Sequence, residues 1–413
     1  MKGILVIVDG MGDLPCKQLD GKTPLESAET PNLNYLASHG DLGQMISVKK
    51  GFIPESDEAI VSIFGNELIS STRGQLEANG TDVKLVRGDL ALRVNFGTID
   101  YLHGGNVIDR RAGRTLTTDE AKILAKEINK IKMPVKFSFI PTIQHRAVVV
   151  FRGGFSDNIS GNDATYFNGN YAMKNKINFC KPLDDEDNSE YTANIVNEFL
   201  EKVYEVLRNH PINFERKKRG LLPANYLFVR GAGIEKPKLK QYSKWISTNY
   251  MPLEIGFSKV SGIDNYTFDY PKMKNSEVYD NLYEGLKKAC EHSIKVIGNH
   301  YKEADYAYVH IKETDLPGHD DKPHDKKKMI EFLDKTLFKF LREFVTKNKI
   351  KVVVTADHCT PCNLKNHSAD AVPVLFYNNS EEKSRKFCEK ECAKGAIGTI
   401  LGKDLLKVVG FLK

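Results

Sequence analysis

Apolar residues along the chain form short unbroken runs and longer stripes of helical period. In the stripes, apolar residues recur three or four positions apart, and the two clearest stripes span residues 196–207 and 330–344. Helices that alternate with buried strands favour right-handed crossovers, and therefore an α/β fold with a mostly parallel sheet sandwiched by helices. The runs that we expect to be buried strands are Ile4–Val8, Tyr226–Val229, Tyr306–Ile311, Val352–Val354 and Val374–Tyr377.

The middle of the chain has a different pattern. The alternation over Ala91–Phe96 predicts a strand, and Ala147–Phe151 is its expected hairpin partner. Thr117 and Glu120 have the spacing of a capping box and predict the start of a helix. We therefore expect an inserted, smaller α+β domain over residues 80–187, between two parts of the α/β domain, residues 1–79 and 188–413.

Composition is typical of a globular protein. Of the 413 residues, 41% are hydrophobic and 28% charged, and 60 Lys+Arg against 54 Asp+Glu give a net charge of +6. This modest excess permits an acidic or phosphorylated ligand without requiring nucleic acid. The first apolar run is too short for a membrane span or a secretory signal. The seven scattered cysteines indicate reduced thiols, so we expect a cytoplasmic protein.

Acidic side chains follow three of the predicted strands. Asp9, Asp315 and Asp357 each lie at or shortly after a strand end, and ligands of open parallel sheets bind beyond the carboxyl ends of the strands. Each residue taken alone is also explained by a turn, a cap or a local hydrogen bond. Their coincidence at one sheet edge favours a site for two divalent ions, to which nearby imidazoles would add ligands: His319, His358 and His367.

Ser56 is the candidate nucleophile for such a site. It precedes the apolar pattern of a predicted helix, at whose N-terminus backbone N–H groups and the helix dipole favour phosphate. A two-metal site suits phosphoryl transfer, for which a serine alkoxide is a suitable acceptor. The alternative is that Ser56 is only the N-cap of this helix, and the two interpretations are compatible.

Arginines of the predicted insert are candidates for binding carboxylate and phosphate groups. The segment Asp109–Arg114 holds Arg110, Arg111 and Arg114, whose guanidinium groups match such anions in geometry. A solvated basic loop explains the segment equally well. Further candidates are Arg73, His145, Arg146 and Arg230.

These motifs together resemble a known family, the archaeal type of cofactor-independent phosphoglycerate mutase in the alkaline phosphatase superfamily. The resemblance covers nearly the whole chain. Its most specific parts are residues 355–362 and 367–374, and the arginine segment 109–114 is moderately specific. It also rests on residues 1–12, 54–59, 73–80, 88–96, 230–233 and 312–320. It implies an alkaline-phosphatase-like fold and the interconversion of 3-phosphoglycerate and 2-phosphoglycerate in glycolysis or gluconeogenesis. It also implies a phosphoserine at Ser56 and no need for 2,3-bisphosphoglycerate.

The resemblance also implies roles for individual residues. One divalent ion would be held by Asp9, Ser56, Asp357 and His358, and the other by Asp315, His319 and His367. Mn²⁺ is the family's usual metal, with Mg²⁺, Co²⁺ or Zn²⁺ as alternatives. The insert would close over the glycerate and exclude water. The residues implied in substrate binding are Asp109, Arg110, Arg111, Arg114, His145 and Arg230.

Two segments depart from the family pattern. The segment Gly161–Thr165 lacks the usual Asp-x-Asp-Pro-His element, and a lysine next to glycine is replaced within Leu253–Gly256. Both changes fall on expected substrate or closure contacts rather than on the metal ligands. The alternative function is therefore a metal-dependent phosphomonoesterase, or a mutase of another phosphorylated hydroxy acid or sugar.

Two other classes of protein are weighed against the enzyme. The cysteine pairs 359/362 and 388/392 have the spacing of a zinc knuckle, but we favour apolar packing for the second pair. The basic runs Arg216–Arg219 and Lys326–Lys328 lack interleaved aromatic residues, so we favour solvated faces over nucleic-acid binding. We expect a small phosphorylated substrate as partner, with neither nucleic acid nor membrane, and leave a homo-oligomer open.

Overall fold

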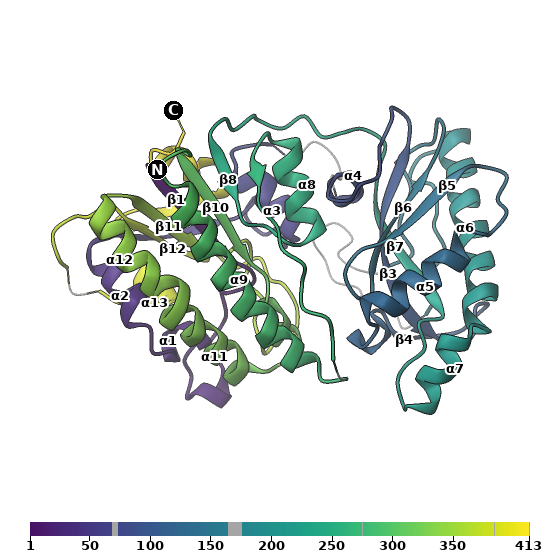
Figure 1. The fold of residues 1–413 in the computed structure, drawn as a ribbon, viewed down its shortest axis with the longest axis horizontal. Coiled ribbons are helices and arrows are strands. Elements are labelled where there is room, and N and C mark those ends of the chain that lie inside the picture. Colours follow the sequence, from purple (N-terminus) through teal and green to yellow (C-terminus); the bar gives the residue numbers. More distant parts are fainter. Residues whose placement is uncertain (68–72, 164–175, 275, 384, 413) are drawn as a thin grey trace.

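The computed structural model describes residues 1–413 except 68–72, 164–175, 275, 384 and 413. The described chain forms two sheets, each with its own helices and its own hydrophobic core. The two units lie side by side in Figure 1. We call the unit around the larger sheet the first domain and the unit around the smaller sheet the second domain.

The first domain is built on an eight-stranded sheet in the order β13-β2-β12-β11-β1-β10-β8-β9. Strand β12 runs antiparallel to both its neighbours, and the other neighbouring pairs are parallel. The mostly parallel sheet predicted from the sequence is thus confirmed. Its strands are β1 (Gly3–Val8), β2 (Gly40–Ile46), β8 (Trp245–Ser247), β9 (Asp264–Asn265), β10 (Tyr306–Ile311), β11 (Lys351–Thr355), β12 (Val372–Tyr377) and β13 (Gly398–Leu401).

Helices cover both faces of this sheet (Figure 1). The predicted stripe over residues 330–344 forms two helices joined by a π-helical turn at Asp334–Phe338. The buried Asp334 carboxylate in that turn accepts hydrogen bonds from the backbone N–H groups of Asn32 (3.2 Å) and Leu33 (2.8 Å), so it caps a neighbouring helix. The helices are α1 (Pro24–Ser27), α2 (Pro31–Ser38), α3 (Ser56–Ile63), α8 (Pro252–Val260), α9 (Val278–His300), α10 (Asp315–His319), α11 (Pro323–Leu333), α12 (Lys339–Asn348), α13 (Glu389–Cys392) and α14 (Leu405–Val408).

As far as its residues are described, the second domain is an antiparallel sheet with three α-helices. Its central strand β3 pairs with β6 over the predicted hairpin residues, and the capping box of Thr117 and Glu120 starts α5 as expected. Its strands are β3 (Leu90–Ile99), β4 (Val107–Asp109), β5 (Phe137–Pro141), β6 (Arg146–Phe151) and β7 (Tyr226–Gly233), and its helices are α5 (Thr118–Ile128), α6 (Asp187–Arg208) and α7 (Pro211–Lys218).

The predicted boundary of the insert at residue 187 is wrong. Strand β7, which we expected in the parallel sheet, pairs antiparallel with β3, and the apolar face of α6 packs into the core of the second domain. The second domain therefore extends to Gly233. An apolar run predicts that a strand is buried, but it does not say which sheet the strand joins.

Helix α4 (Arg73–Asn79) lies between the domains and contacts both (Figure 1). A Cβ atom on Gly74 would lie 2.2 Å from the carbonyl oxygen of Ala91 in β3 and 2.4 Å from that of Gly231 in β7. Just beyond the helix, a Cβ atom on Gly80 would lie 1.8 Å from the carbonyl oxygen of Pro252 in α8. Only glycine permits these close backbone approaches.

Two basic residues expected on solvated faces are buried instead. Lys326 forms an ion pair with Asp13 (2.7 Å), and Arg216 pairs with Glu120 (2.9 Å). Both cations pair with carboxylates that lie far away in the sequence. The charges that neighbour each cation in the sequence do not reveal these partners. Cys388 and Cys392 are buried, unpaired thiols in the core of the first domain, as expected for apolar packing. Among the described residues, no helix is long and apolar enough to cross a membrane.

Candidate active site

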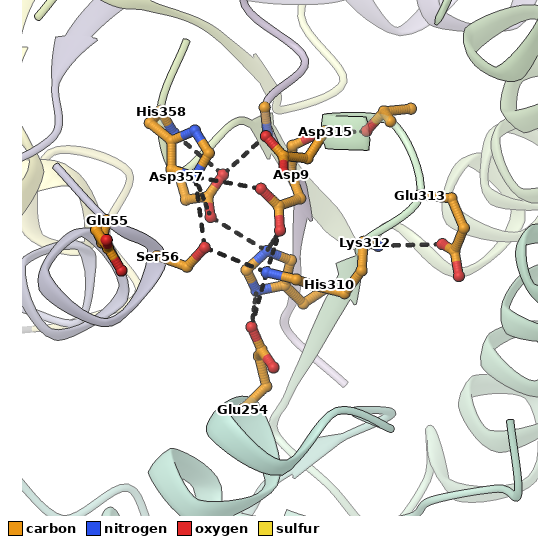
Figure 2. A network of polar contacts seen from close by, with 12 residues as sticks. Asp9, Glu55, Ser56, Glu254, His310, Lys312, Glu313, Asp315, Asp357 and His358 are labelled. Carbon is orange, nitrogen blue, oxygen red and sulfur yellow. Dashed lines mark hydrogen bonds and ion pairs between the residues drawn. The ribbon is translucent and has the colours of Figure 1, made fainter. Parts of the chain in front are cut away.

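Three acidic residues meet at the carboxyl edge of the parallel sheet (Figure 2). Asp9 directly follows β1, Asp357 follows β11, and Asp315 is the first residue of α10, after β10. The Nε2 atom of His358 lies 3.3 Å from Asp9 Oδ1 and 3.4 Å from Asp357 Oδ2. Gly10 lets the chain turn here, because its φ is +60° and a Cβ atom would lie 2.7 Å from Asp315 Oδ1.

The other predicted ligands adjoin this group. Asp315 lies 3.3 Å from His319 Nε2 and 3.6 Å from His367 Nε2. The rings of His358 and His367 stack with their centroids 3.7 Å apart, which links the two groups into one cluster. The Nδ1 atom of His367 bonds the carbonyl of Pro54 (2.9 Å), and that of His319 bonds the carbonyl of Lys365 (3.1 Å). These bonds leave the Nε2 atoms facing Asp315.

The cluster fits divalent metal ions. Two of its carboxylate oxygens, Asp9 Oδ1 and Asp357 Oδ2, are buried and have no hydrogen-bond partner among the residues described. Two triads bring their ligand atoms within 4.8 Å of one another: Asp9, His310 and Asp357, and Asp315, His358 and His367. Burial lowers the pKa of His358 to about 3, so its imidazole is neutral and has a lone pair for a metal. Carboxylates and imidazoles together suit Mn²⁺, Zn²⁺ and similar ions.

His310 is a member of this cluster that the sequence analysis missed. It lies on β10, with Nε2 3.6 Å from Asp357 Oδ2 and 3.9 Å from Asp9 Oδ2, and its Nδ1 is 2.8 Å from Tyr308 Oη. A histidine inside an otherwise apolar strand was the available signal.

Ser56 is the first residue of α3 and faces the same cluster. Its Oγ atom lies 3.4 Å from His358 Nε2 and accepts a hydrogen bond from Lys312 Nζ (3.3 Å). The N-cap of α3 is Glu55, which forms a capping box with Glu58, so the interpretation of Ser56 as the N-cap is wrong. The Ser56 hydroxyl is therefore available for other interactions.

Lys312 brings a cation into the cluster that the sequence analysis did not single out. Its ammonium pairs with Asp9 and, at 2.8 Å, with Glu254 (Figure 2). Burial opposes the charged form, but Asp9 and Glu254 outweigh it and raise the pKa of Lys312, which stays protonated. Lys312 follows β10 at the edge that carries Asp315, so its place in the chain was the missed signal.

A cavity of about 580 Å³ lies between the two domains. Asp9, Ser56, Asp315, His319 and His367 line it from the first domain. From the second domain it is lined by all six predicted substrate-binding residues, namely Asp109, Arg110, Arg111, Arg114, His145 and Arg230. The structure thus brings five of the seven expected metal ligands and all the expected substrate-binding residues to one cavity.

Two guanidinium groups and one imidazole in this cavity have no partners among the described residues. The side chains of Arg111 and Arg146 make no hydrogen bond or ion pair with any residue that the structure describes. Burial, Arg114 and Arg110 lower the pKa of Arg111 to about 10, so it remains a cation at neutral pH. Neither ring nitrogen of the buried His145 has a hydrogen-bond partner in the portion of the chain that the structure describes.

The other cavity arginines are paired. Arg110 Nε donates to Asp163 Oδ1 (2.5 Å), and Arg114 pairs across the domains with Asp320 (2.5 Å). Arg230 pairs with Glu55, which also accepts from Arg73 (2.6 Å). Asp109 Oδ1 accepts the backbone N–H groups of Arg111 (2.7 Å) and Gly113 (2.9 Å), so this carboxylate shapes the segment that carries the arginines.

The fold and the site define a two-domain α/β enzyme, in which a cluster of carboxylates and imidazoles that fits metal ions faces an arginine-rich cavity. Comparison with known proteins then gives the family. A 2,3-bisphosphoglycerate-independent phosphoglycerate mutase from Thermococcus kodakarensis is 38% identical over 99% of this chain and 96% of its own length. A second such mutase, from Archaeoglobus fulgidus, is 36% identical over 99% of this chain and 97% of its own. The family model for 2,3-bisphosphoglycerate-independent phosphoglycerate mutase matches residues 37–213. The chain belongs to this family, as the motifs predicted.

Solved structures agree with this assignment. A protein from Pyrococcus horikoshii superposes with a TM-score of 0.74 at 30% identity, over 100% of this chain and 98% of that one. The cofactor-independent phosphoglycerate mutase from Thermoplasma acidophilum superposes with a TM-score of 0.56 at 26% identity, over the full length of both chains.

Proposed function

We propose that this chain interconverts 3-phosphoglycerate and 2-phosphoglycerate by passing the phosphoryl group through Ser56. One observation carries the proposal: across a single cavity, a serine beside a cluster that fits metal ions faces guanidinium groups that have no ion-pair partner in the described part of the chain. The phosphoryl group of the substrate suits the serine and its neighbouring cluster, and the carboxylate of the substrate suits the guanidinium groups. The names of the relatives support the same reaction.

The cluster would hold two divalent ions. Asp9, Ser56, Asp357 and His358 are the proposed ligands of one ion, and Asp315, His319 and His367 those of the other. When bound, such ions acidify a hydroxyl group and stabilise negative charge on a transferred phosphoryl group. We propose Mn²⁺ as the physiological metal, with Mg²⁺, Co²⁺ or Zn²⁺ as the alternatives that the same ligands accept.

Residues of the first domain prepare Ser56 for attack. The ammonium of Lys312, 3.3 Å from Ser56 Oγ, stabilises the alkoxide by charge. Ser56 begins α3, so the phosphoryl group that it accepts lies at a helix N-terminus, where the dipole favours an anion. His358, neutral and 3.4 Å from Oγ, adds no charge that would repel the lysine.

Residues of the second domain hold the glycerate. Arg111 and Arg146 are the proposed partners of its carboxylate, because their guanidinium groups line the cavity and pair with no anion among the residues that the structure describes. After Ser56 takes the phosphoryl group from the 3-position, the glycerate reorients in the cavity, and its 2-hydroxyl takes the group back. Closed domains exclude water, whose attack on phosphoserine is the competing reaction. The remaining proposed contacts are Asp109, Arg110, Arg114, His145 and Arg230.

The test is to incubate the purified protein with 3-phosphoglycerate and each of the four metal ions, without 2,3-bisphosphoglycerate. Both 2-phosphoglycerate and free phosphate are followed. Formation of 2-phosphoglycerate with little free phosphate, fastest with Mn²⁺, is the expected result. Release of phosphate alone would identify the protein as a phosphomonoesterase. Activity only with another phosphorylated hydroxy acid would change the assigned substrate but leave the proposed role of Ser56 unchanged.

A further inference from the structure

Arg216 is completely buried, although the basic run that contains it looks like a solvated surface. Its guanidinium group has five N–H donors, and all of them have acceptors in the second domain. Nε donates to the carbonyl of Leu222 (3.0 Å). Nη1 donates to the carbonyl of Thr115 (3.1 Å) and to Glu120 Oε2 (2.9 Å), and Nη2 donates to the carbonyl of Ala112 (3.3 Å) and to Thr115 Oγ1 (2.8 Å).

One of these five bonds goes to Ala112 in the segment Asp109–Arg114, which we call the arginine loop, and two go to Thr115, the residue directly after it. The backbone of this loop is unusual, because Ala112, Gly113 and Arg114 have consecutive φ angles of +47°, +66° and +56°. Alanine and arginine rarely adopt this left-handed conformation, so the surrounding structure must hold it. Asp109 holds the loop from within through two backbone N–H groups, and Arg216 holds its far end.

We propose that Arg216 is a positioning residue for substrate binding, which sets the conformation of the arginine loop and thereby aims Arg110, Arg111 and Arg114 into the cavity. Arg216 does not line the cavity, so it acts through the loop rather than by touching the substrate. This inference rests on the proposed function, in which these arginines face the glycerate.

The chemistry of the contact calls for arginine. The planar fork of Arg216 reaches two carbonyl groups, a hydroxyl and a carboxylate at once, and a lysine ammonium at the same place would satisfy fewer of them. Arg219 provides a matched control, because it pairs with the other oxygen of the same carboxylate, Glu120 Oε1, at 2.7 Å. The Arg219 side chain is 56% exposed, and among the described residues it makes no hydrogen bond to the arginine loop. Its loss therefore removes a charge partner of Glu120 without releasing the loop.

The experiment compares Arg216→Met, Arg216→Lys and Arg219→Ala with the parent protein, all loaded with Mn²⁺. Four quantities are measured: kcat and KM for 3-phosphoglycerate, the ratio of free phosphate to 2-phosphoglycerate, the Kd of 3-phosphoglycerate, and hydrolysis of p-nitrophenyl phosphate. We expect Arg216→Met to raise KM and Kd at least tenfold and to raise the phosphate ratio severalfold. Hydrolysis of p-nitrophenyl phosphate, which needs Ser56 but no glycerate-binding arginine, should stay within twofold of the parent. Arg216→Lys should not restore the parent values, and Arg219→Ala should match the parent.

Two outcomes would overturn the proposal. One is a folded Arg216→Met protein with the parent's KM, Kd and phosphate ratio. The other is an equal fall in all activities, p-nitrophenyl phosphate hydrolysis included, which indicates a general structural role. If Arg216→Met does not fold, Thr115→Val decides, because it removes the hydroxyl that accepts from Arg216 (2.8 Å) and donates to the carbonyl of Ala112 (3.2 Å): a rise in KM of a few fold supports the proposal and an unchanged KM refutes it. A parent protein that makes no 2-phosphoglycerate would refute the proposed mutase function, whereas equal Kd values in parent and variant refute only the role of Arg216.

Discussion

Replacing Arg111 with methionine should weaken substrate binding and leave the fold intact. The Arg111 guanidinium lines the cavity, and no carboxylate among the described residues pairs with it. Its neighbours Arg110 and Arg114 are cations, and with burial they lower its pKa to about 10. An unpaired cation in such surroundings costs folding free energy, so its presence is explained by an anion that binds there.

The size of the effect follows from the contact that is lost. A hydrogen bond to a charged group contributes about 1.5–3 kcal/mol, and each 1.4 kcal/mol is about tenfold in an equilibrium constant. We therefore expect Arg111→Met to lower kcat/KM for 3-phosphoglycerate by roughly 10- to 150-fold, and to raise the share of substrate that is hydrolysed. The thermal midpoint should stay the same or rise slightly, because repulsion between neighbouring arginines is relieved.

Arg110→Met is the matched control for stability. Arg110 pairs with Asp163, whose side chain is only 1% exposed and whose other cation, Arg230, lies farther away at 3.9 Å, so the variant leaves a buried carboxylate poorly paired and should lose up to about 3 kcal/mol of unfolding free energy. Steady-state kinetics with phosphate detection, together with urea unfolding, measure both variants. If Arg111→Met keeps kcat/KM within twofold of the parent, or loses as much stability as Arg110→Met, Arg111 is not the carboxylate receptor.

Three further predictions concern the first domain. Ser56→Ala should abolish the mutase reaction while elemental analysis finds the metal content retained, and normal activity would remove Ser56 as the nucleophile. Lys312→Met should lower activity and cost the metal-free protein about 3 kcal/mol of unfolding free energy, because Asp9 and Glu254 lose their buried counter-charge; an unchanged urea midpoint in EDTA would contradict this. Burial raises the pKa of Glu313 from 4.5 to about 7. The folded metal-free protein therefore holds a proton that the unfolded chain has lost, so stability should fall by up to roughly 3 kcal/mol as the pH rises from 4.5 to 7. Burial also raises the pKa of Glu58 to about 8 and that of Glu389 to about 7, and both add to the fall. Glu313→Gln should therefore reduce the fall by the share of Glu313, and identical pH profiles would exclude Glu313 as a source.

The meeting of the carboxylates and imidazoles in one cluster was predictable because its geometry follows from the sheet. Residues at the carboxyl ends of parallel strands meet at one edge, so Asp9 and Asp357 could be placed together from the position of their strands alone. Ser56 was placed by the start of a helical pattern. Such arguments need only local patterns and a rule of topology.

The predictions from the sequence were wrong where contacts between residues far apart in the chain determine the structure. Nothing near Lys326 in the sequence indicates that it is buried against Asp13, which lies more than three hundred positions away. The apolar run Tyr226–Val229 would suit either sheet, and its partner β3 was not identifiable from the run itself. Lys312 was missed because a lysine after a strand is usually solvated, whereas here Asp9 and Glu254 hold it inside.

The pairing of β3 with β7 has a consequence for how this enzyme is assembled. These are the first and last strands of the second domain, and they lie next to each other, with Gly74 packed against both. The polypeptide therefore leaves the first domain and returns to it through neighbouring strands. A block joined in this way can be exchanged for another without rebuilding the sheet that carries Asp9, Asp315 and Asp357. In such an architecture, the second domain and the substrate preference that it sets can change as one unit, while the residues at the carboxyl edge of the larger sheet stay the same.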